Sequence, residues 1–424
     1  MSPKPETAPY RTAFDRHHPA GHDERREAAL SRFETLGFPT RRDEAWRFTD
    51  LKKLHRAVFA PAEGAIHAVP DLVPWRFAGD AHRIVLVNGR FARELSQVGD
   101  LPKGVIFGSL AANPALIEQT FDPTDTEGGQ AFTALNAALF ADGFALVVPA
   151  GVHLDVPVEI VHWGAASGRS FHLRHLIALG AGATATVIET YAGQGDYWTN
   201  AVTTVRLDAG AKLRHAKLQD ESSLAIHFAQ VRADLASDAR YESFVLTLGG
   251  NLSRHDSAVL YGGADATCGL FGAYLLRGEQ EATNATFVDH AVPSCTTTEV
   301  FKGVVDERAH GVFLGSIMVR QDAQKTNANQ LNKNLLLSPR AAVDTKPQLE
   351  ILADDVKCSH GATVGDLDEE ALFYLEARGI PAPEARRMLI EAFAADAIDQ
   401  IEDDVDLRAH FVTQVQRWLG GGAK

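Results

Sequence analysis

The chain has 424 residues, of which 45% are hydrophobic and 23% charged, the balance of an ordinary folded protein. This composition excludes intrinsic disorder for the chain as a whole, and the length is enough for two or three domains. The 41 Lys and Arg against 55 Asp and Glu give a net charge of −14, which repels nucleic acid and anionic lipid. We therefore expect neither nucleic acid nor a membrane among its partners.

The three cysteines, Cys268, Cys295 and Cys358, are too few and too scattered for a disulfide framework. They fit a reducing compartment. Residues 1–10 are polar and include three prolines, so they lack the apolar segment of a secretory signal. The longest apolar stretch, 176–188, spans 13 residues, fewer than the ~20 that a membrane-spanning helix needs. We expect a cytoplasmic protein.

Residues 1–142 are predicted to form a mostly helical N-terminal domain. The expected elements are helices over 23–36, 42–54 and 131–140 and a strand over 83–88. Asp23 can cap the first helix and Gly37 stands at its exit. Asn88-Gly89 after the strand is a tight-turn signal.

Residues 143–365 are predicted to be almost pure β-structure. Runs of Val, Leu, Ile, Thr and Phe alternate with small-residue turns, and no helical pattern interrupts them, which excludes an alternating βαβ architecture. A faint repeat begins at Leu179, Leu207 and Leu235, 28 residues apart each time. A period in the twenties favours a β-solenoid, in which each coil buries its face on the next. A large antiparallel sandwich is the alternative.

The repeat also explains a match to a nucleotide-binding motif. Residues 180–185 fit G-x-G-x-x-A, but no helix signal follows and a similar small-residue turn recurs 28 residues later. We therefore predict a solenoid turn rather than a dinucleotide site. The sequence also contains no G-x-x-x-x-G-K-[ST], so the chain has no P-loop of its own.

A segment rich in side-chain amides lies near the end of the β-region. Its members are Gln324, Asn327, Asn329, Gln330, Asn332 and Asn334. Amides at regular offsets can form hydrogen-bonded ladders along stacked coils. A polar loop is an equally good reading of the composition.

Residues 366–424 are predicted to form a small helical domain. Helices are expected over 366–378, 384–401 and 405–419. Asp366 and Glu369 have the spacing of a capping box at the first of them. The second helix carries an apolar stripe formed by Met388, Leu389, Ala392, Phe393 and Ala397. Such a stripe is more often internal packing than a docking face.

One short element between the β-region and the helical domain could carry chemistry. In an extended strand Cys358 and His360 point to one face and Ser359 to the other. A thiolate and an imidazole on one face suit a soft metal such as iron, zinc or copper(I), although a complete site needs further ligands. A buried Cys beside a hydrogen-bonded His is the plainer reading, and a Cys–His catalytic dyad is a third.

Several stretches resemble the signature of one known family. They are Gln324-Lys-Thr326, Asn334-Leu-Leu-Leu-Ser338, Asp344-Thr-Lys-Pro-Gln-Leu-Glu-Ile351, Asp354-Asp-Val-Lys-Cys-Ser-His-Gly-Ala-Thr363, Leu372-Phe-Tyr-Leu-Glu-Ala-Arg-Gly-Ile380 and Glu44-Ala-Trp-Arg-Phe-Thr-Asp-Leu51. Together they resemble the SufB/SufD family, the scaffold proteins of the SUF iron–sulfur cluster assembly system. The resemblance covers nearly the whole chain and is densest over residues 320–395.

Within this family the chain is more similar to the SufD branch than to the SufB branch. Ser359 and Gly361 stand where SufB proteins typically carry Glu, and Leu375 stands where SufB usually has a cysteine. The chain is also shorter than a typical SufB. These differences argue against a primary sulfur-accepting role for this subunit.

The resemblance implies a right-handed parallel β-helix between helical terminal domains, in agreement with the repeat. It also implies that the β-helix edge pairs with SufB and that the C-terminal helices dock SufC, an ABC-type ATPase. A separate ATPase would account for the missing P-loop. The expected docking residues are Phe373, Tyr374, Arg378, Met388, Leu389 and Phe393.

The resemblance further implies that a nascent cluster forms at the SufB–SufD interface. His360 matches the histidine held to serve there, and Cys358 is expected beside it as a neighbour or auxiliary ligand. The cluster would be transient and shared with SufB, so no bound cofactor is expected in the isolated chain, and flavin in the complex stays open. ATP-driven closure of SufC is expected to strain this interface and expose both side chains.

Two other functions remain in view. A solenoid with an unpaired edge could associate with itself as a homodimeric scaffold. A β-helix enzyme acting on polysaccharide is the other, and it predicts secretion and clustered carboxylates on one strand face. The missing signal peptide and the lack of such a cluster count against that enzyme, so we expect a non-catalytic scaffold.

Overall fold

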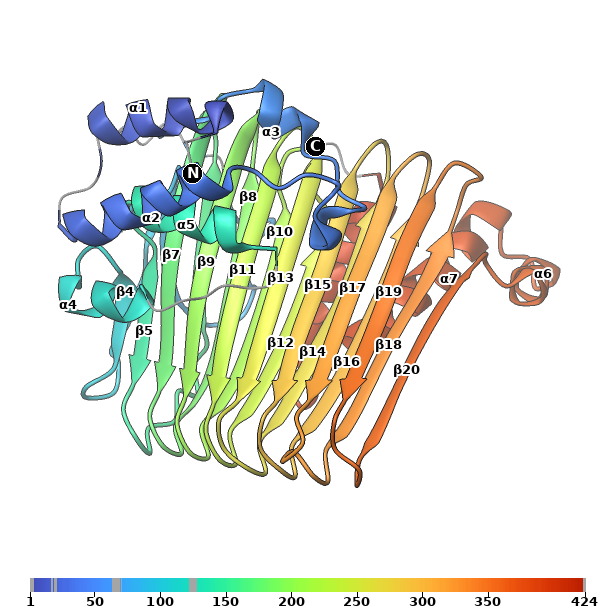
Figure 1. Cartoon of the computed structure of the whole chain (residues 1–424). Coiled ribbons are helices and arrows are strands. Elements are labelled where there is room, and N and C mark those ends of the chain that lie inside the picture. The colour runs from blue at the N-terminus through green and yellow to red at the C-terminus, as the bar shows by residue number, and fades with distance from the viewer. Residues whose placement is uncertain are drawn as a thin grey trace.

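The computed structural model describes residues 4–16, 18, 21–62, 69, 71–121 and 128–421. Two ten-stranded sheets run side by side, and the chain alternates between them for about eight turns (Figure 1). The first sheet contains β4 (Ile106–Ser109), β5 (Phe144–Val148), β7 (Arg169–Leu179), β9 (Tyr197–Leu207), β11 (Ile226–Leu235), β13 (Leu252–Tyr261), β15 (Glu281–His290), β17 (His310–Val319) and β19 (Ala342–Ile351), with β1 (Ala60–Pro61) beside β7. The second contains β3 (Arg90–Phe91), β2 (His82–Val87), β6 (Val158–Gly164), β8 (Thr184–Gly193), β10 (Lys212–Asp220), β12 (Arg240–Thr247), β14 (Thr267–Leu276), β16 (Thr296–Val305), β18 (Asn327–Leu336) and β20 (Lys357–Gly365).

The strand register confirms the solenoid and rules out the antiparallel sandwich. Every pairing from β5 and β6 onward is parallel, and Leu179, Leu207 and Leu235 are Cα partners across β7, β9 and β11. One repeat of the sequence is therefore one coil of the structure. Each coil adds two strands, and its inward apolar side chains are covered only when the next coil stacks upon it.

Backbone conformation explains the small-residue turns of the repeat. Gly182, Gly210 and Asp238, again 28 residues apart, have positive φ values of 66°, 69° and 59°. A glycine adopts this left-handed conformation without steric cost, and Asp tolerates it better than most residues. The G-x-G-x-x-A match is thus a solenoid turn, as predicted.

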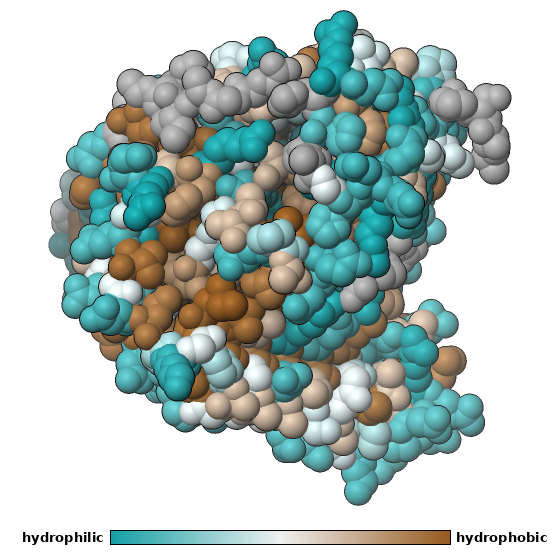
Figure 2. All heavy atoms as spheres, turned by 90° about the vertical axis from the view of Figure 1, so that its left-hand side faces the viewer, coloured by the Kyte–Doolittle hydropathy of each residue, from teal (hydrophilic) through white to brown (hydrophobic). Residues whose placement is uncertain are grey.

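The N-terminal helices cover the outer face of the first sheet. They are α1 (Ala8–Arg16), α2 (Asp23–Leu36), α3 (Lys52–Arg56), α4 (Pro114–Ile117) and α5 (Gln130–Leu139), with 3-10 turns η1 (Pro5–Thr7), η2 (Glu44–Trp46), η3 (Arg93–Leu95) and η4 (Glu118–Thr120). Phe132 and Trp46 pack against Phe228 of β11, with ring centroids 4.7 and 5.7 Å from it. This apolar contact fixes the helices on the sheet. Figure 2 looks onto the end of the solenoid where the chain begins, and hydrophilic and hydrophobic atoms alternate over it.

Most predicted N-terminal elements are confirmed, and two details are wrong. The helix over 23–36 and the strand that ends at Asn88-Gly89 are present as α2 and β2, and β2 joins the second sheet. Asp23 is the first helical residue, and the capping position holds His22, which makes no side-chain cap bond. The helix expected over 42–54 is two short pieces, η2 and α3, because the Trp46 indole donates to Gly128 O at 2.9 Å and ties the chain to a distant loop.

The C-terminal helices α6 (Glu369–Ala377), α7 (Ala382–Ile398) and α8 (Val405–Leu419) follow β20. Helices α7 and α8 pack on the outer face of the second sheet, where Phe411 meets Phe244 of β12 at 4.7 Å between ring centroids. Helix α6 has no buried residue and projects from the body (Figure 1). Its cap is Asp368, which accepts hydrogen bonds from Glu370 N and Ala371 N, so the capping box predicted at Asp366 is wrong.

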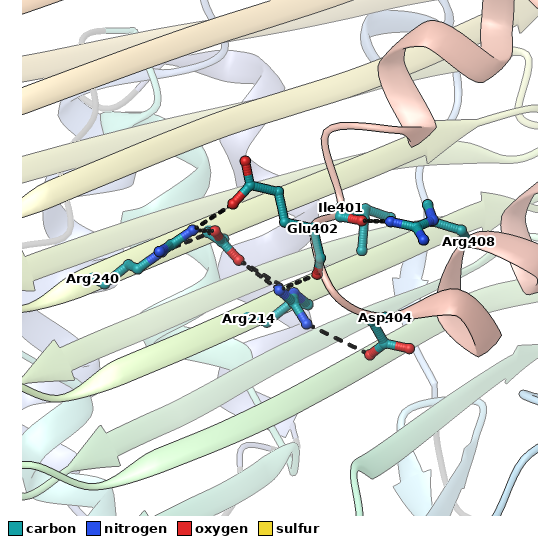
Figure 3. A network of polar contacts seen from close by, with 7 residues as sticks. Arg214, Arg240, Ile401, Glu402, Asp404 and Arg408 are labelled. Carbon is teal, nitrogen blue, oxygen red and sulfur yellow. Dashed lines mark hydrogen bonds and ion pairs between the residues drawn. The ribbon is translucent and has the colours of Figure 1, made fainter.

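A polar clamp holds the loop between α7 and α8 to the second sheet (Figure 3). Arg214 of β10 donates to the Glu402 carbonyl at 2.7 Å and lies 3.6 Å from the Asp404 carboxylate. Arg240 of β12 forms an ion pair with the Glu402 carboxylate at 3.2 Å. The clamp supplements the apolar contact beneath α8. Among the described helices, none has the length and apolar character needed to cross a membrane.

Candidate functional site

The last strand, β20, positions the two side chains singled out in the sequence. In the ladder with β18, Cys358 is opposite Ala328 and His360 is opposite the fully buried Gln330. Cys358 packs against the main solenoid core, so it and His360 lie on the inward face, because side chains at i and i+2 share a face. Ser359 lies on the opposite face and donates to Asn329 Oδ1 at 3.1 Å. The predicted arrangement of this triplet is confirmed.

Solvent reaches this face because no further coil covers it. His360 is exposed and Cys358 is half-buried. Partial burial raises the pKa of the Cys358 thiol, although its backbone surroundings partly oppose this. The sulfur is therefore held as a thiol and becomes a ligand when a metal displaces the proton.

The two edges of the last coil differ in their capacity to pair with another strand. Beyond β19 and β20 neither sheet has a further strand among the described residues. Pro347 stands in the middle of β19 and has no N–H to donate, which blunts that edge. The half of β20 from Gly361 to Gly365 holds neither Pro nor a charged residue. The β20 edge is thus the one suited to backbone pairing.

A column of three polar side chains leads from the interior to this edge. Glu299, Gln330 and His360 are successive Cα partners on β16, β18 and β20. Gln330 Nε2 donates to Glu299 Oε2 at 2.8 Å, and Thr286 Oγ1 donates to the same oxygen at 2.9 Å. Burial raises the pKa of Glu299 to about 7. The sequence analysis missed Glu299, although its distance of one coil from Gln330 is a signal that could have identified it.

The amide-rich segment is neither of its two predicted forms. Five of its six amides lie on β18 rather than in a loop. They bond to unlike neighbours instead of forming a ladder of identical groups: Asn332 Nδ2 donates to Phe301 O at 3.2 Å and Asn334 Nδ2 donates to Asn332 Oδ1 at 2.7 Å. The amides therefore satisfy polar groups inside the last coils. They keep the edge ordered where apolar packing runs out.

The other two cysteines do not belong to this site. Cys268 lies in the column of Cys358, separated from it by Thr297 and Ala328, and is buried. Burial raises the pKa of Cys268 far above its ordinary value. Cys295 is buried at a turn, where its thiol lies 3.5 Å from Gly263 O. A buried thiol that stays protonated is inert, so Cys358 is the reactive one.

A second group of potential metal ligands lies deep in the solenoid. Within the described part of the chain, His162, His175 and Glu189 are the only three such side chains found close enough to share an ion. The Phe144 amide donates to His175 Nδ1 at 3.1 Å, which leaves the Nε2–H of this neutral ring to donate to Tyr191 Oη at 3.2 Å. Tyr191 in turn donates to Glu189 Oε2 at 2.7 Å, and His215 contacts Oε1 at the same distance.

These ligand atoms are already used in hydrogen bonds, so the group is a buried polar network and not a metal site. Burial lowers the pKa of both His162 and His175, which keeps the rings neutral. The network is also remote from the edge. Glu189 is on β8, six strands from β20, which at ~4.8 Å per strand is about 29 Å.

The predicted docking residues surround α6 and the start of α7. Phe373 and Tyr374 are 73% and 56% exposed, and the Arg378 guanidinium lies 4.3 Å from the centre of the Tyr374 ring. On α7, Met388 is exposed, and Leu389 and Phe393 are half-buried. The single apolar stripe predicted for this helix is wrong in part. Its buried face is formed by Ala385, Ile390, Ala394, Ala397 and Ile398.

Comparison with known proteins agrees with this architecture. A family model described as SUF system FeS cluster assembly, SufBD core domain, matches residues 162–393, and one for the SufBD protein N-terminal region matches residues 9–160. The iron–sulfur cluster assembly protein SufD of Escherichia coli is 34% identical over 93% of this chain and 92% of its own length. An iron–sulfur cluster assembly SufBD family protein of Synechocystis is 32% identical, over 89% and 87%. Protein ABCI7, chloroplastic, of Arabidopsis thaliana is 30% identical, over 88% and 82%.

The fold and the site define a parallel β-solenoid protein with a thiol and an imidazole on an edge that is open to another chain. The chain belongs to the SufBD family of iron–sulfur cluster assembly proteins.

Proposed function

We propose that this chain is a non-catalytic scaffold subunit of the SUF assembly complex, on which a nascent cluster forms at an interface with SufB. The open last coil is the observation that carries the proposal. Cys358 and His360 share one face of an edge strand and are accessible from outside. Iron in a cluster takes four ligands, so two side chains from this subunit leave positions for sulfide and for a partner chain.

SufB would pair with the β20 edge. Residues 361–365 offer unblocked backbone groups, whereas Pro347 interrupts the β19 edge. An incoming strand would satisfy those groups by strand addition, and it would place the partner's ligands beside His360. The same edge accounts for self-association when SufB is absent.

SufC would dock on α6 and the exposed side of α7. Two large aromatic side chains as exposed as Phe373 and Tyr374 favour a protein contact at this position. Arg378 stacked on Tyr374 adds a cation to the same surface. The ATPase would supply the nucleotide site that the sequence lacks.

Motion of SufC has a physical route to the cluster site. Asp396 of α7 forms an ion pair with Lys302 of β16, and the Lys302 ammonium lies 4.5 Å from the centre of the Phe393 ring. Strand β16 also carries Glu299, which bonds to Gln330 beside His360. A pull on α7 would strain β16, β18 and β20 in turn and open the edge to iron and sulfide. This is a two-state element biased by a nucleotide.

Anaerobic purification of a tagged copy from its own cells tests the proposal. We expect an ABC-type ATPase and a longer SufB-type paralogue to co-purify, identified by mass spectrometry. Variants truncated before Glu369 should lose the ATPase and keep the paralogue. Recovery of the chain alone, after cross-linking as well, would contradict the scaffold function.

A further inference from the structure

A cavity of about 470 Å³ lies where three parts of the fold meet. Its floor is formed by turns at the carboxyl ends of second-sheet strands, including residues 193–195 and 220–224. Its walls are Trp75, from the segment that precedes β2, and the last turn of α8. The volume is in the range of small-molecule sites, about 300–1,000 Å³. Neither the cluster site nor the proposed docking residues line it.

Three indole rings line the cavity. Trp75 and Trp163 lie 5.4 Å apart between ring centroids, and Trp418 of α8 completes the set. The Trp75 indole donates to Asp220 Oδ2 at 2.8 Å. Trp163 and Trp418 are only 2% and 8% exposed, yet neither indole N–H has a hydrogen-bond partner in the described part of the chain. An unpartnered buried donor costs about 1–3 kcal/mol, and a ligand that supplies an acceptor would recover this cost.

The charged groups of the cavity also favour an acceptor-bearing ligand. The guanidiniums of Arg277 and Arg417 stack on Trp418 and Trp75, at 4.6 and 5.4 Å from the ring centres. Both donate to backbone carbonyls, Arg277 to Trp418 O and Arg417 to Pro74 O, and each guanidinium has five N–H groups in all. Of the two carboxylates that line the cavity, Asp220 accepts from Trp75, and Glu221 is paired with His227 at 2.7 Å.

We propose that this cavity binds a small anion built on a flat aromatic ring. The ring would lie among the three indoles, since offset and edge-on aromatic contacts favour such packing. Its anionic group would accept from the two arginines and from the indole N–H groups of Trp163 and Trp418. Because α8 forms one wall, the bound ligand holds the C-terminal helices against the solenoid.

Titration of the full-length chain with AMP and with benzoate tests this site. Adenosine and benzamide serve as the matched uncharged probes. Three of the five tryptophans line the cavity, while Trp46 and Trp198 belong to the N-terminal core, so a saturable change in tryptophan emission reports on this site. Calorimetry gives the dissociation constants. We expect Arg277→Gln to weaken binding about tenfold or more, and Arg387→Gln on the outer side of α7 to leave it unchanged.

Each outcome bears on the proposal. Binding of AMP alone identifies a phosphate-bearing ring as the ligand, and binding of benzoate alone identifies a carboxylate-bearing ring. Equal binding of adenosine and AMP, or of benzamide and benzoate, would overturn the anionic requirement. Absence of saturable binding by either anion, or binding that neither Arg277→Gln nor Arg417→Gln weakens, would overturn the site. Circular dichroism of both variants checks that they are folded.

Discussion

Gln330 donates its side-chain N–H to the Glu299 carboxylate at 2.8 Å, across two adjacent strands of the second sheet. The next position in that column is His360, on the last strand of the solenoid. The hydrogen bond therefore connects a fully buried acid in the interior to the ligand-bearing edge. The predictions below begin with this column and then move to the edge and to the C-terminal helices.

Glu299 is expected to make stability fall as pH rises. Burial raises its folded-state pKa from 4.5 to about 7, so between these values the folded chain keeps a proton that the unfolded chain has lost. The free energy of unfolding should thus decrease across this window, by at most about 3 kcal/mol from this group, and level off above it. Chemical denaturation at pH 5 and pH 8 would show a smaller decrease in Glu299→Gln than in the unmodified chain. Identical pH dependence would contradict the assignment.

His360→Ala is expected to abolish cluster assembly while leaving the complex intact. The side chain is exposed, so its loss costs little folding free energy, whereas loss of a ligand or of its support weakens metal binding by about tenfold or more. Transfer of a cluster to an apo-ferredoxin, followed by its absorbance, measures the effect. Ser359→Ala, on the opposite face of β20, is the matched control and should assemble clusters normally. Full activity of His360→Ala would exclude this residue from the site.

Cys358→Ser is expected to reduce assembly less than His360→Ala does. The thiol is half-buried and its raised pKa disfavours the thiolate, so it is suited to an auxiliary role. Reactivity toward iodoacetamide at pH 7 should be slow in the isolated chain and faster in the ATP-bound complex, in which the edge is strained open. Equal labelling rates in the two states would count against a nucleotide-driven opening.

A charge on the β20 edge is expected to block partner association. Thr363→Lys would require a desolvated ammonium between paired strands, which should weaken the SufB-type contact by at least about tenfold. Gln348→Lys places the same charge on the β19 edge, beside Pro347, and should have the smaller effect. Analytical ultracentrifugation of the purified pair compares the two. A larger effect at Gln348 would reassign the pairing edge.

Phe373→Ala is expected to weaken ATPase docking by about 30-fold without destabilising the chain. The ring is 73% exposed in the isolated subunit, so its removal should change the free energy of unfolding by no more than about 0.5 kcal/mol. Phe411→Ala provides the contrast, because that ring is buried against Phe244 and its loss should cost about 3–5 kcal/mol. Surface plasmon resonance against SufC and thermal unfolding distinguish the two effects. Undiminished binding of Phe373→Ala would move the docking surface elsewhere.

The sequence by itself determined the repeating part of the molecule. The 28-residue spacing of Leu179, Leu207 and Leu235 identified the coil, since each coil needs one stretch of apolar residues to bury and one turn with a left-handed residue. Helix α8 was predicted with its observed bounds for a similar reason, because its periodicity and terminal residues are local signals. The C-x-H spacing likewise placed Cys358 and His360 on one face, because the two-residue period of a strand is independent of its surroundings.

Only the tertiary structure decided which residues meet across coils. Glu299, Gln330 and His360 are 31 and 30 residues apart rather than 28, because the later turns are longer, so a fixed period does not align them. It also decided which face of α7 is buried, since Met388 and Ala397 belong to one stripe in sequence but to opposite environments on the sheet. Side-chain spacing records local periodicity, whereas burial depends on the surface that packs against the element, and that surface comes from strands more than a hundred residues earlier in the chain.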